Sequence, residues 1–175
     1  MTPIYKQIVP SPKKPKATDP LITPFFLETE DSLDPAAPAK VAPVNMKQFM
    51  LAGNATFTVR SEKTQTRFTL KVRRPSLTSP HFVSVLTGSD NETSYGFVGT
   101  IFGNGTYAHG TRSRITPEAP AAKAARWVVE RVLAGKELSH CELWHEGRCG
   151  RCGRALTVPS SIELGLGPEC AKLTY

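Results

Sequence analysis

The sequence predicts an α+β fold, in which a small antiparallel sheet of about five strands is packed by one helix and followed by a cysteine-rich module. Three observations predict it. Apolar and polar residues alternate repeatedly between residues 55 and 109, which is the pattern of half-buried strands. A helical stripe of apolar residues follows. Three of the four cysteines then gather within the last 30 residues.

The 175 residues divide into three segments of different composition. Residues 1–45 hold nine of the fifteen prolines and are expected to form a disordered tail. Residues 46–139 form a basic α+β domain, and residues 140–175 a zinc-binding module. No apolar run is long enough for a membrane helix, and the N-terminus lacks the apolar core of a secretion signal. We therefore expect a cytoplasmic protein that does not bind membranes.

The strands are expected in two groups. Residues 55–60 and 67–73 alternate and are joined by a short polar segment, which predicts a hairpin. Further strands are expected at residues 81–87, 95–102 and 106–109. The Asn104-Gly105 pair between the last two is a strong turn signal.

One helix is expected after the strands. Thr116 is a suitable N-cap, Pro117 suits the first helical turn, and Gly135 is a suitable C-terminal stop. Its apolar stripe (Ala121, Ala125, Val128 and Val132) is expected to pack on the sheet.

The C-terminal segment carries the spacing of a metal site, His145-x3-Cys149-x2-Cys152-x17-Cys170. Two cysteines two residues apart form a knuckle that directs both thiolates at one ion, and structural zinc requires four ligands in a tetrahedron. His145 is favoured as the fourth ligand, with Cys141 and His140 as alternatives. A catalytic zinc keeps an open coordination position, whereas four protein ligands close the site, so we expect structural rather than catalytic Zn²⁺. Free or redox-active cysteines are the other interpretation.

The segment from Gly147 to Ala171 resembles a zinc-knuckle domain of unknown function that is found in bacteriophage and bacterial proteins. The shared pattern is roughly C-x-x-C-G-R-x-L-T-x-P-x-S-I-x-x-G-x-G-P-x-C, and the residues from Cys149 to Cys170 match it closely. His145-Glu146 before the knuckle is also similar to that family. The resemblance implies zinc, with His145 as a ligand, and a phage or bacterial origin. The family has no known activity that the resemblance could extend to this chain.

The predicted hairpin is strongly basic. Residues 54–75 hold six basic residues and one acidic residue, and residues 46–140 carry the whole net charge of +7. Cations on one face of a hairpin attract phosphates, so nucleic acid is the expected partner. No aromatic residue lies among the cations on this outward face of the hairpin, so base stacking of the kind that grips single strands is not expected. The candidate nucleic-acid-binding residues are Arg60, Lys63, Arg67, Lys71, Arg73, Arg74, Arg112 and Arg114.

The sequence therefore predicts a small, phage-encoded, non-catalytic protein that binds zinc and nucleic acid in the bacterial host cytoplasm. The alternative is a protein-binding adaptor, or an inhibitor of a host defence or replication protein. The apolar island at residues 21–27 of the tail is a candidate docking segment for a host or phage protein. The other interpretations of the basic face are a binding surface for an acidic protein partner and a solvated surface that discourages aggregation.

Overall fold

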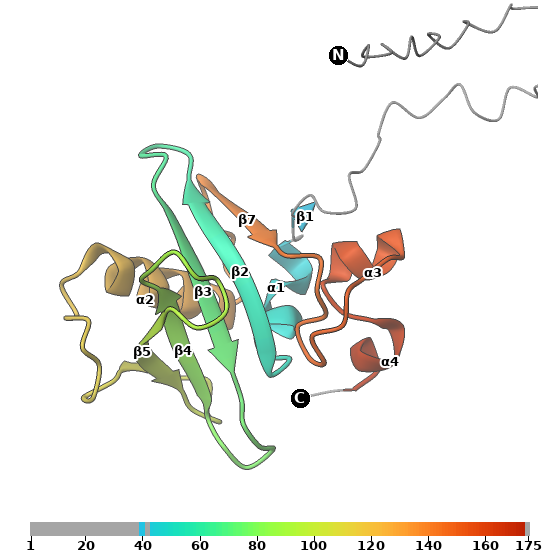
Figure 1. The fold of residues 1–175 in the computed structure, drawn as a ribbon, viewed down its shortest axis with the longest axis horizontal. Helices are drawn as coiled ribbons and strands as arrows, with labels where there is room; N and C mark the ends of the chain where they lie inside the picture. Colours follow the sequence, from blue (N-terminus) through green and yellow to red (C-terminus); the bar gives the residue numbers. More distant parts are fainter. Residues whose placement is uncertain (1–38, 41–42, 174–175) are drawn as a thin grey trace, which may run out of the picture. The chain divides into compact units, whose positions relative to one another are not determined.

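The computed structural model describes residues 39–40 and 43–173, and their strands form one antiparallel sheet (Figure 1). The sheet has seven strands in the order β1-β7-β2-β3-β4-β5-β6. The strands are β1 (Ala39–Lys40), β2 (Asn54–Ser61), β3 (Arg67–Arg73), β4 (His81–Leu86), β5 (Tyr95–Ile101), β6 (Tyr107–His109) and β7 (Cys141–His145).

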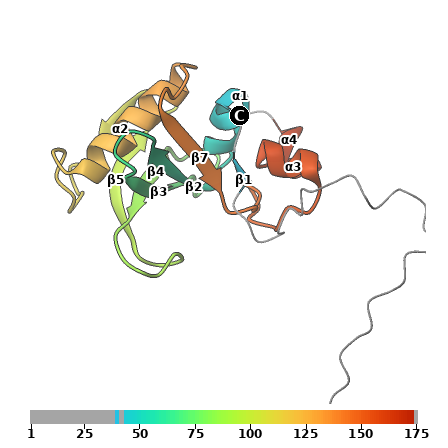
Figure 2. The same ribbon diagram turned by 90° about the horizontal axis from the view of Figure 1, so that it is seen from above.

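Four helices accompany the sheet, and two of them cover one of its faces. They are α1 (Pro43–Met50), α2 (Pro120–Leu133), α3 (Pro159–Leu164) and α4 (Pro168–Ala171). In Figure 2, α2 lies on one side of the sheet, and the loop between β4 and β5 projects on the other side. We call the face that α1 and α2 cover the inner face, and the opposite one the outer face.

The core lies between the inner face and these two helices. Each strand places alternate side chains on this face, and α1 adds Met46, Phe49 and Met50. The packing confirms the predicted α+β class. The fully buried members of the core from the strands and α2 include Phe57, Leu70, Val72, Val83, Val85, Val98, Ala125 and Val129.

All five predicted strands are present, but the predicted start of the helix is wrong. The helix begins at Pro120 rather than Pro117, and its N-cap residue is Ala119. The Ala119 N–H donates to the Thr116 carbonyl oxygen at 3.1 Å, so residues 116–119 form a turn. Both prolines suit a first helical turn, and a sequence pattern cannot choose between them. The predicted stop is confirmed, because Gly135 follows α2 with φ of 65°.

Three elements were not predicted: β1, α1 and β7. β7 falls within the segment assigned to the zinc-binding module, yet it pairs with β2 in the sheet, where His145 lies opposite Phe57. The expected tail, up to residue 38, and its island at residues 21–27 lie outside the described residues. Among the described residues, none of the helices has the length and apolar character needed to cross a bilayer.

Candidate metal centre and basic sheet face

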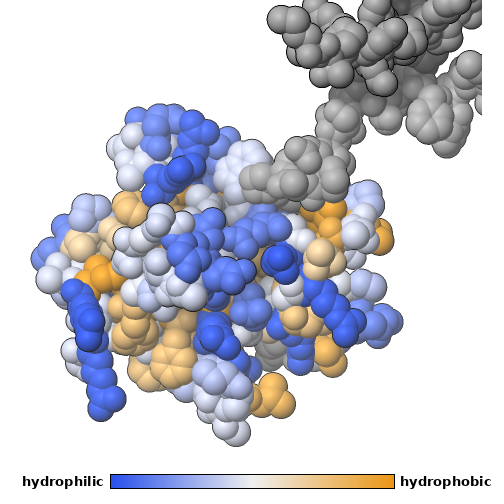
Figure 3. Space-filling view, in the orientation of Figure 1, coloured by the Kyte–Doolittle hydropathy of each residue, from blue (hydrophilic) through white to orange (hydrophobic). Residues whose placement is uncertain are grey.

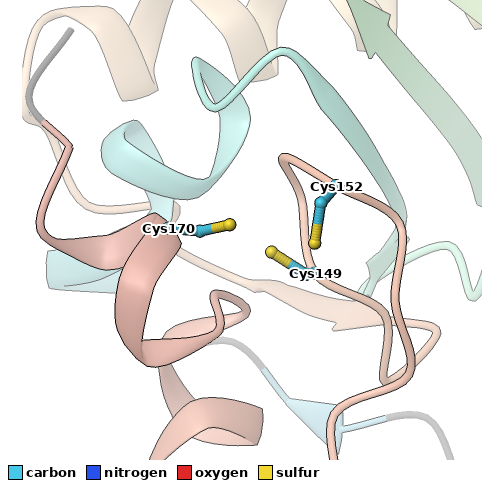
Figure 4. A group of neighbouring side chains, drawn as sticks. All are labelled: Cys149, Cys152 and Cys170. Atoms are coloured by element: carbon cyan, nitrogen blue, oxygen red, sulfur yellow. The ribbon is translucent and has the colours of Figure 1, made fainter.

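Three cysteines converge beside α1. Cys149 and Cys152 come from the loop after β7, and Cys170 comes from α4. Figure 4 shows their sulfur atoms directed toward one another. The three Sγ atoms lie within 4.8 Å of one another, and all are free thiols.

The loop that carries Cys149 and Cys152 is a tight knuckle. The Gly153 N–H donates to the Cys149 carbonyl oxygen at 2.9 Å, and the Cys149 N–H donates to the Arg154 carbonyl oxygen at 2.8 Å. Gly153 has φ of 74°, a conformation that glycine adopts without strain. The turn therefore places both thiols on the same side of the loop.

The third thiol is positioned by two short helices. α3 ends at Gly165, which has φ of 68° and reverses the chain toward Pro168, where α4 begins. Cys170 is the third residue of α4. The Gly167 N–H just before this helix donates to Cys149 Sγ at 3.4 Å, which ties the two parts of the cluster together.

The surroundings of the thiols differ in their electrostatics. Burial alone would raise the pKa of Cys149, but the N–H groups of Cys152, Gly167 and Arg151 outweigh it and lower the pKa to about 7. Burial raises the pKa of Cys170 to about 11, helped by the neighbouring Cys149 and Cys152. One thiolate therefore forms readily, and three at once require a cation among them.

A metal ion fits this group. A tetrahedral zinc with Zn–S bonds of about 2.3 Å holds its sulfurs about 3.8 Å apart, within the spread of the three Sγ atoms. Three thiols form a soft ligand set, which suits zinc, copper(I) and iron–sulfur clusters rather than magnesium or calcium. No His, Asp or Glu side chain of residues 39–40 and 43–173 joins the group.

The structure places His145 apart from the three cysteines. Its side chain is 1% exposed, and the backbone binds both of its ring nitrogens. Nδ1 accepts from the Gly147 N–H at 3.0 Å, and Nε2 lies 2.6 Å from the Ile162 carbonyl oxygen, to which it donates. Burial lowers the pKa of His145, although the bond to Ile162 opposes this shift, so the ring is neutral.

The two alternative fourth ligands lie elsewhere. Cys141 and His140 are at the start of β7, where they line a groove with residues of α2. His140 Nδ1 lies 3.9 Å from the Glu62 carboxylate. Burial raises the pKa of the Cys141 thiol, and the charge of Glu62 adds to this rise. Neither side chain belongs to the cysteine group.

The cysteine module is held against α1 and β2 by contacts that the sequence analysis did not identify. Phe49 of α1 is fully buried and lies against Gly150 and Gly165, since a Cβ on Gly165 would come within 2.5 Å of its ring. The Asn54 N–H donates to the Gly150 carbonyl oxygen at 2.7 Å. Gln48 Nε2 donates to the Ala171 carbonyl oxygen at 3.0 Å. The apolar spacing of Met46, Phe49 and Met50 is the signal that could have predicted α1.

The structure brings four of the eight candidate nucleic-acid-binding residues onto the outer face. Arg60 lies opposite Arg67 in the β2–β3 pair, and Lys71 and Arg73 follow Arg67 at alternate positions of β3. Arg60 lies 3.9 Å from the Glu142 carboxylate. Neither Arg67 nor Arg73 has an ion-pair partner within the part of the chain that the structure describes. β3 therefore carries a row of cations.

The other four candidates lie off the strands. Lys63 is exposed in the turn between β2 and β3, and Arg112 and Arg114 are exposed between β6 and α2. Arg74 Nε donates to the Ser79 carbonyl oxygen at 3.1 Å, and its Nη2 donates to that of Leu77. Arg74 thus stabilises the loop that joins β3 to β4.

The outer face also carries aromatic side chains, on strands that flank the hairpin. Phe82 of β4 lies opposite Arg73, and Phe97 of β5 lies opposite Ser84 of β4. Lys71 Nζ lies 4.7 Å from the ring centroid of Tyr95. Figure 3 views this face, on which hydrophilic residues surround an apolar patch over β4 and β5. The cations of the β2–β3 hairpin therefore have no aromatic residue among them on the outer face of their own strands, but the outer face as a whole does carry aromatic side chains, on β4 and β5.

Residues 145–174 match a family of unknown function, DUF6011. The DUF6011 match contains all three clustered cysteines and confirms a C-terminal domain of unknown function. Comparison with curated proteins and with solved structures gave no match.

Proposed function

We propose that this protein binds nucleic acid through the outer face of its sheet and that a zinc ion stabilises its C-terminal module. The observation that carries the proposal is the row of Arg67, Lys71 and Arg73 on β3. Residues two apart on a strand are separated by about 6.8 Å, so Lys71 and Arg73 can contact successive phosphates. The resemblance to phage and bacterial proteins favours the bacterial cytoplasm as the site of this activity.

Zinc is the metal we propose for the three thiols. A C-x-x-C knuckle with a third cysteine is a typical zinc ligand set, and zinc has no redox chemistry that would disturb it. The module has little apolar core of its own: Cys149 and Leu166 form a small buried cluster with Ala52, which follows α1, and with a few half-buried neighbours. Metal binding therefore supplies much of its folding free energy. Since the backbone binds both nitrogens of His145, we propose that the three thiolates are the ligands that the described residues supply. The proposal gives the metal no catalytic role.

Charge reversal on β3 tests the proposal. The variant Arg67→Glu/Arg73→Glu is compared with Lys136→Glu, which changes an exposed lysine beyond the end of α2. Fluorescence anisotropy measures binding to labelled 20-nucleotide DNA and RNA between 50 and 200 mM salt. We expect the double variant to bind at least tenfold more weakly and with a shallower salt dependence, and Lys136→Glu to bind much more like the wild type. If the wild type binds no nucleic acid at 50 mM salt, the proposal is wrong.

A protein partner is the second candidate function, because of a groove between α2 and the β2–β3 hairpin. It encloses about 600 Å³ and is lined by apolar side chains such as Val59, Phe68 and Trp127. Trp127 is 37% exposed, and the Arg131 guanidinium lies 5.1 Å from its ring. Lys63 and Arg131 line the same groove, so the partner that fits best is an apolar peptide with acidic residues.

The groove has its own test. Isothermal titration of a phenylalanine-containing acidic peptide into the wild type and Trp127→Ala would show weaker binding to the variant. Equal binding to both, or none to either, would remove this candidate without affecting the nucleic-acid proposal, because the groove lies on the α2 side of the sheet.

A further inference from the structure

The register of the sheet arranges the outer side chains in rows that cross several strands. One row runs from Trp144 of β7 through Thr58 of β2 to Thr69 of β3. The two threonine hydroxyls lie 2.8 Å apart and form a hydrogen bond. The next row contains Thr56, Lys71, Ser84 and Phe97, and a third contains Asn54, Arg73, Phe82 and Thr100. The outer face therefore carries cations, small polar groups and aromatic rings on neighbouring strands.

The aromatic rings of these rows are accessible from solvent. Phe82 is 36% exposed, and Phe97 and Trp144 are half-buried. The Phe82 and Phe97 rings meet edge to face, with centroids 6.1 Å apart and planes at 64°. This contact fixes both rings and leaves part of Phe82 uncovered. A fixed, partly uncovered ring costs little entropy when a flat ligand stacks on it.

A polar hollow of about 440 Å³ adjoins the rows on the side of the cysteine module. Its floor is formed by Asn54, Thr56 and Lys71, and the β4–β5 loop and Cys149 form parts of its walls. Lys71 Nζ also donates to the Glu92 carbonyl oxygen of that loop at 3.4 Å. Amide and hydroxyl groups of this kind read the edges of bases.

The charges around the hollow have both signs. Arg148 and Lys71 line it, and so do Glu92 and Glu146. The carboxylates disfavour a phosphate there and can accept from base amino groups. The hollow thus suits a base, whereas Arg67 and Arg73 of β3, which have no ion-pair partner among the described residues, suit the phosphates.

We infer that the ligand of the outer face is single-stranded nucleic acid, seated with bases on Phe82 and its neighbours and phosphates on the cations of β3. The inference rests on the proposed nucleic-acid binding and names the form of the ligand. In a duplex the bases are stacked inside, so their faces cannot reach rings on a sheet. A single strand can splay its bases onto such rings, and stacking is tolerant of sequence.

The experiment compares single-stranded and duplex ligands with aromatic variants. Labelled 12-nucleotide single strands of DNA and RNA, and the 12-base-pair DNA duplex, are titrated with wild type, Phe82→Leu, Phe82→Tyr and Trp127→Leu. Phe82→Leu keeps apolar volume without a ring, and Phe82→Tyr restores a ring. Trp127 is a partly exposed aromatic on the α2 side and serves as the control.

We expect the wild type to prefer single strands of DNA, RNA or both over duplex by at least tenfold. Phe82→Leu should lose about tenfold in single-strand affinity with an unchanged salt slope, because stacking carries no charge. Phe82→Tyr should recover most of this loss, and Trp127→Leu should match the wild type. Circular dichroism of each variant checks that it is folded.

A second readout does not depend on a change at Phe82. The chain has two tryptophans, so Trp127→Phe leaves Trp144 of the outer face as the single one. Its fluorescence should be quenched by a single strand. Two outcomes would overturn this inference and leave the proposed function standing. In the first, the wild type binds duplex as tightly as single strands. In the second, Phe82→Leu binds single strands as tightly as the wild type does, whereas Arg67→Glu/Arg73→Glu loses binding. Absence of binding to every nucleic acid would overturn both.

Discussion

The ring of Phe49 lies against the imidazole of His145, with centroids 5.5 Å apart and planes inclined at 46°. Phe49 belongs to α1, and His145 ends β7. The His145 imidazole in turn donates to the Ile162 carbonyl oxygen of α3. This chain of contacts connects the sheet, α1 and the cysteine module, so changes at Phe49 should reach the metal centre.

Phe49→Ala should therefore weaken both the fold and the metal site. The ring is fully buried between Gly150, Gly165 and Phe57, and removing a buried phenylalanine costs about 3–5 kcal/mol. Urea unfolding monitored by circular dichroism measures the loss, and a chelator competition measures metal affinity. Phe102→Ala, at a 46% exposed position, is the control and should cost less than about 1 kcal/mol. Unchanged metal affinity in a folded Phe49→Ala protein would contradict the coupling.

Serine substitution of each cysteine distinguishes the three proposed metal ligands from Cys141, which lies outside the cysteine group. Cys149→Ser, Cys152→Ser and Cys170→Ser each remove one of the three converging thiols, so each should lower the bound metal well below one equivalent. Cys141→Ser changes a thiol in the groove beside α2 and should keep about one equivalent. Native mass spectrometry and elemental analysis give the stoichiometry and the metal. Loss of metal from Cys141→Ser alone would mean that the cysteines are grouped differently.

Local patterns allowed much of the fold to be predicted. The alternation in residues 55–109 depends on neighbours along the chain, and the five strands were accordingly placed correctly within a residue or two. The residues of β7 alternate in the same way, since Leu143 and His145 are buried while Trp144 is half-buried. Cys141 and His145 of this stretch were interpreted as candidate metal ligands, and for this reason the strand was not predicted.

The relations between distant residues could not be predicted. The aromatic rings of the outer face come from β4, β5 and β7, and only the strand order brings them beside the cations of β3. The grouping of Cys149 with Cys152 follows from their C-x-x-C spacing, because a knuckle is a local structure. The surroundings of His145 depend on Ile162, a carbonyl 17 residues away whose position no spacing rule gives.

The role of His145 is tested by His145→Gln and His145→Ala. In the structure its ring bonds to the backbone at Gly147 and Ile162, so both variants should keep the metal and lose stability. Leaving buried partners unsatisfied costs about 1–3 kcal/mol, and glutamine, which can both donate and accept, should lose less than alanine. Metal analysis and thermal unfolding measure the two effects. A folded His145→Ala protein without metal would instead make His145 the fourth ligand, as its spacing from Cys149 predicts.

His81 should make the protein less stable in mild acid. Burial lowers its pKa, although the hydrogen bond of Nε2 to the Leu51 carbonyl oxygen at 3.0 Å opposes the shift, and the charge of Arg74 lowers it further. In the unfolded chain a histidine titrates near pH 6.5. As the pH falls below that value, the unfolded state binds a proton that the folded state does not. Stability is therefore complete above pH 6.5 and is lost as the pH falls toward the lower pKa of the folded state.

His81→Gln removes this titration while its amide can still donate to Leu51. We expect the wild type to lose stability relative to His81→Gln between pH 7.5 and 5.5, with a slope of at most about 1.4 kcal/mol per pH unit for one proton. Urea unfolding at several pH values, with saturating metal in both proteins, measures the difference. Burial also lowers the pKa of His145, so each protein alone loses stability in acid and only their difference reports His81. A difference that stays constant over this range would show that His81 takes up its proton equally in the folded and unfolded states.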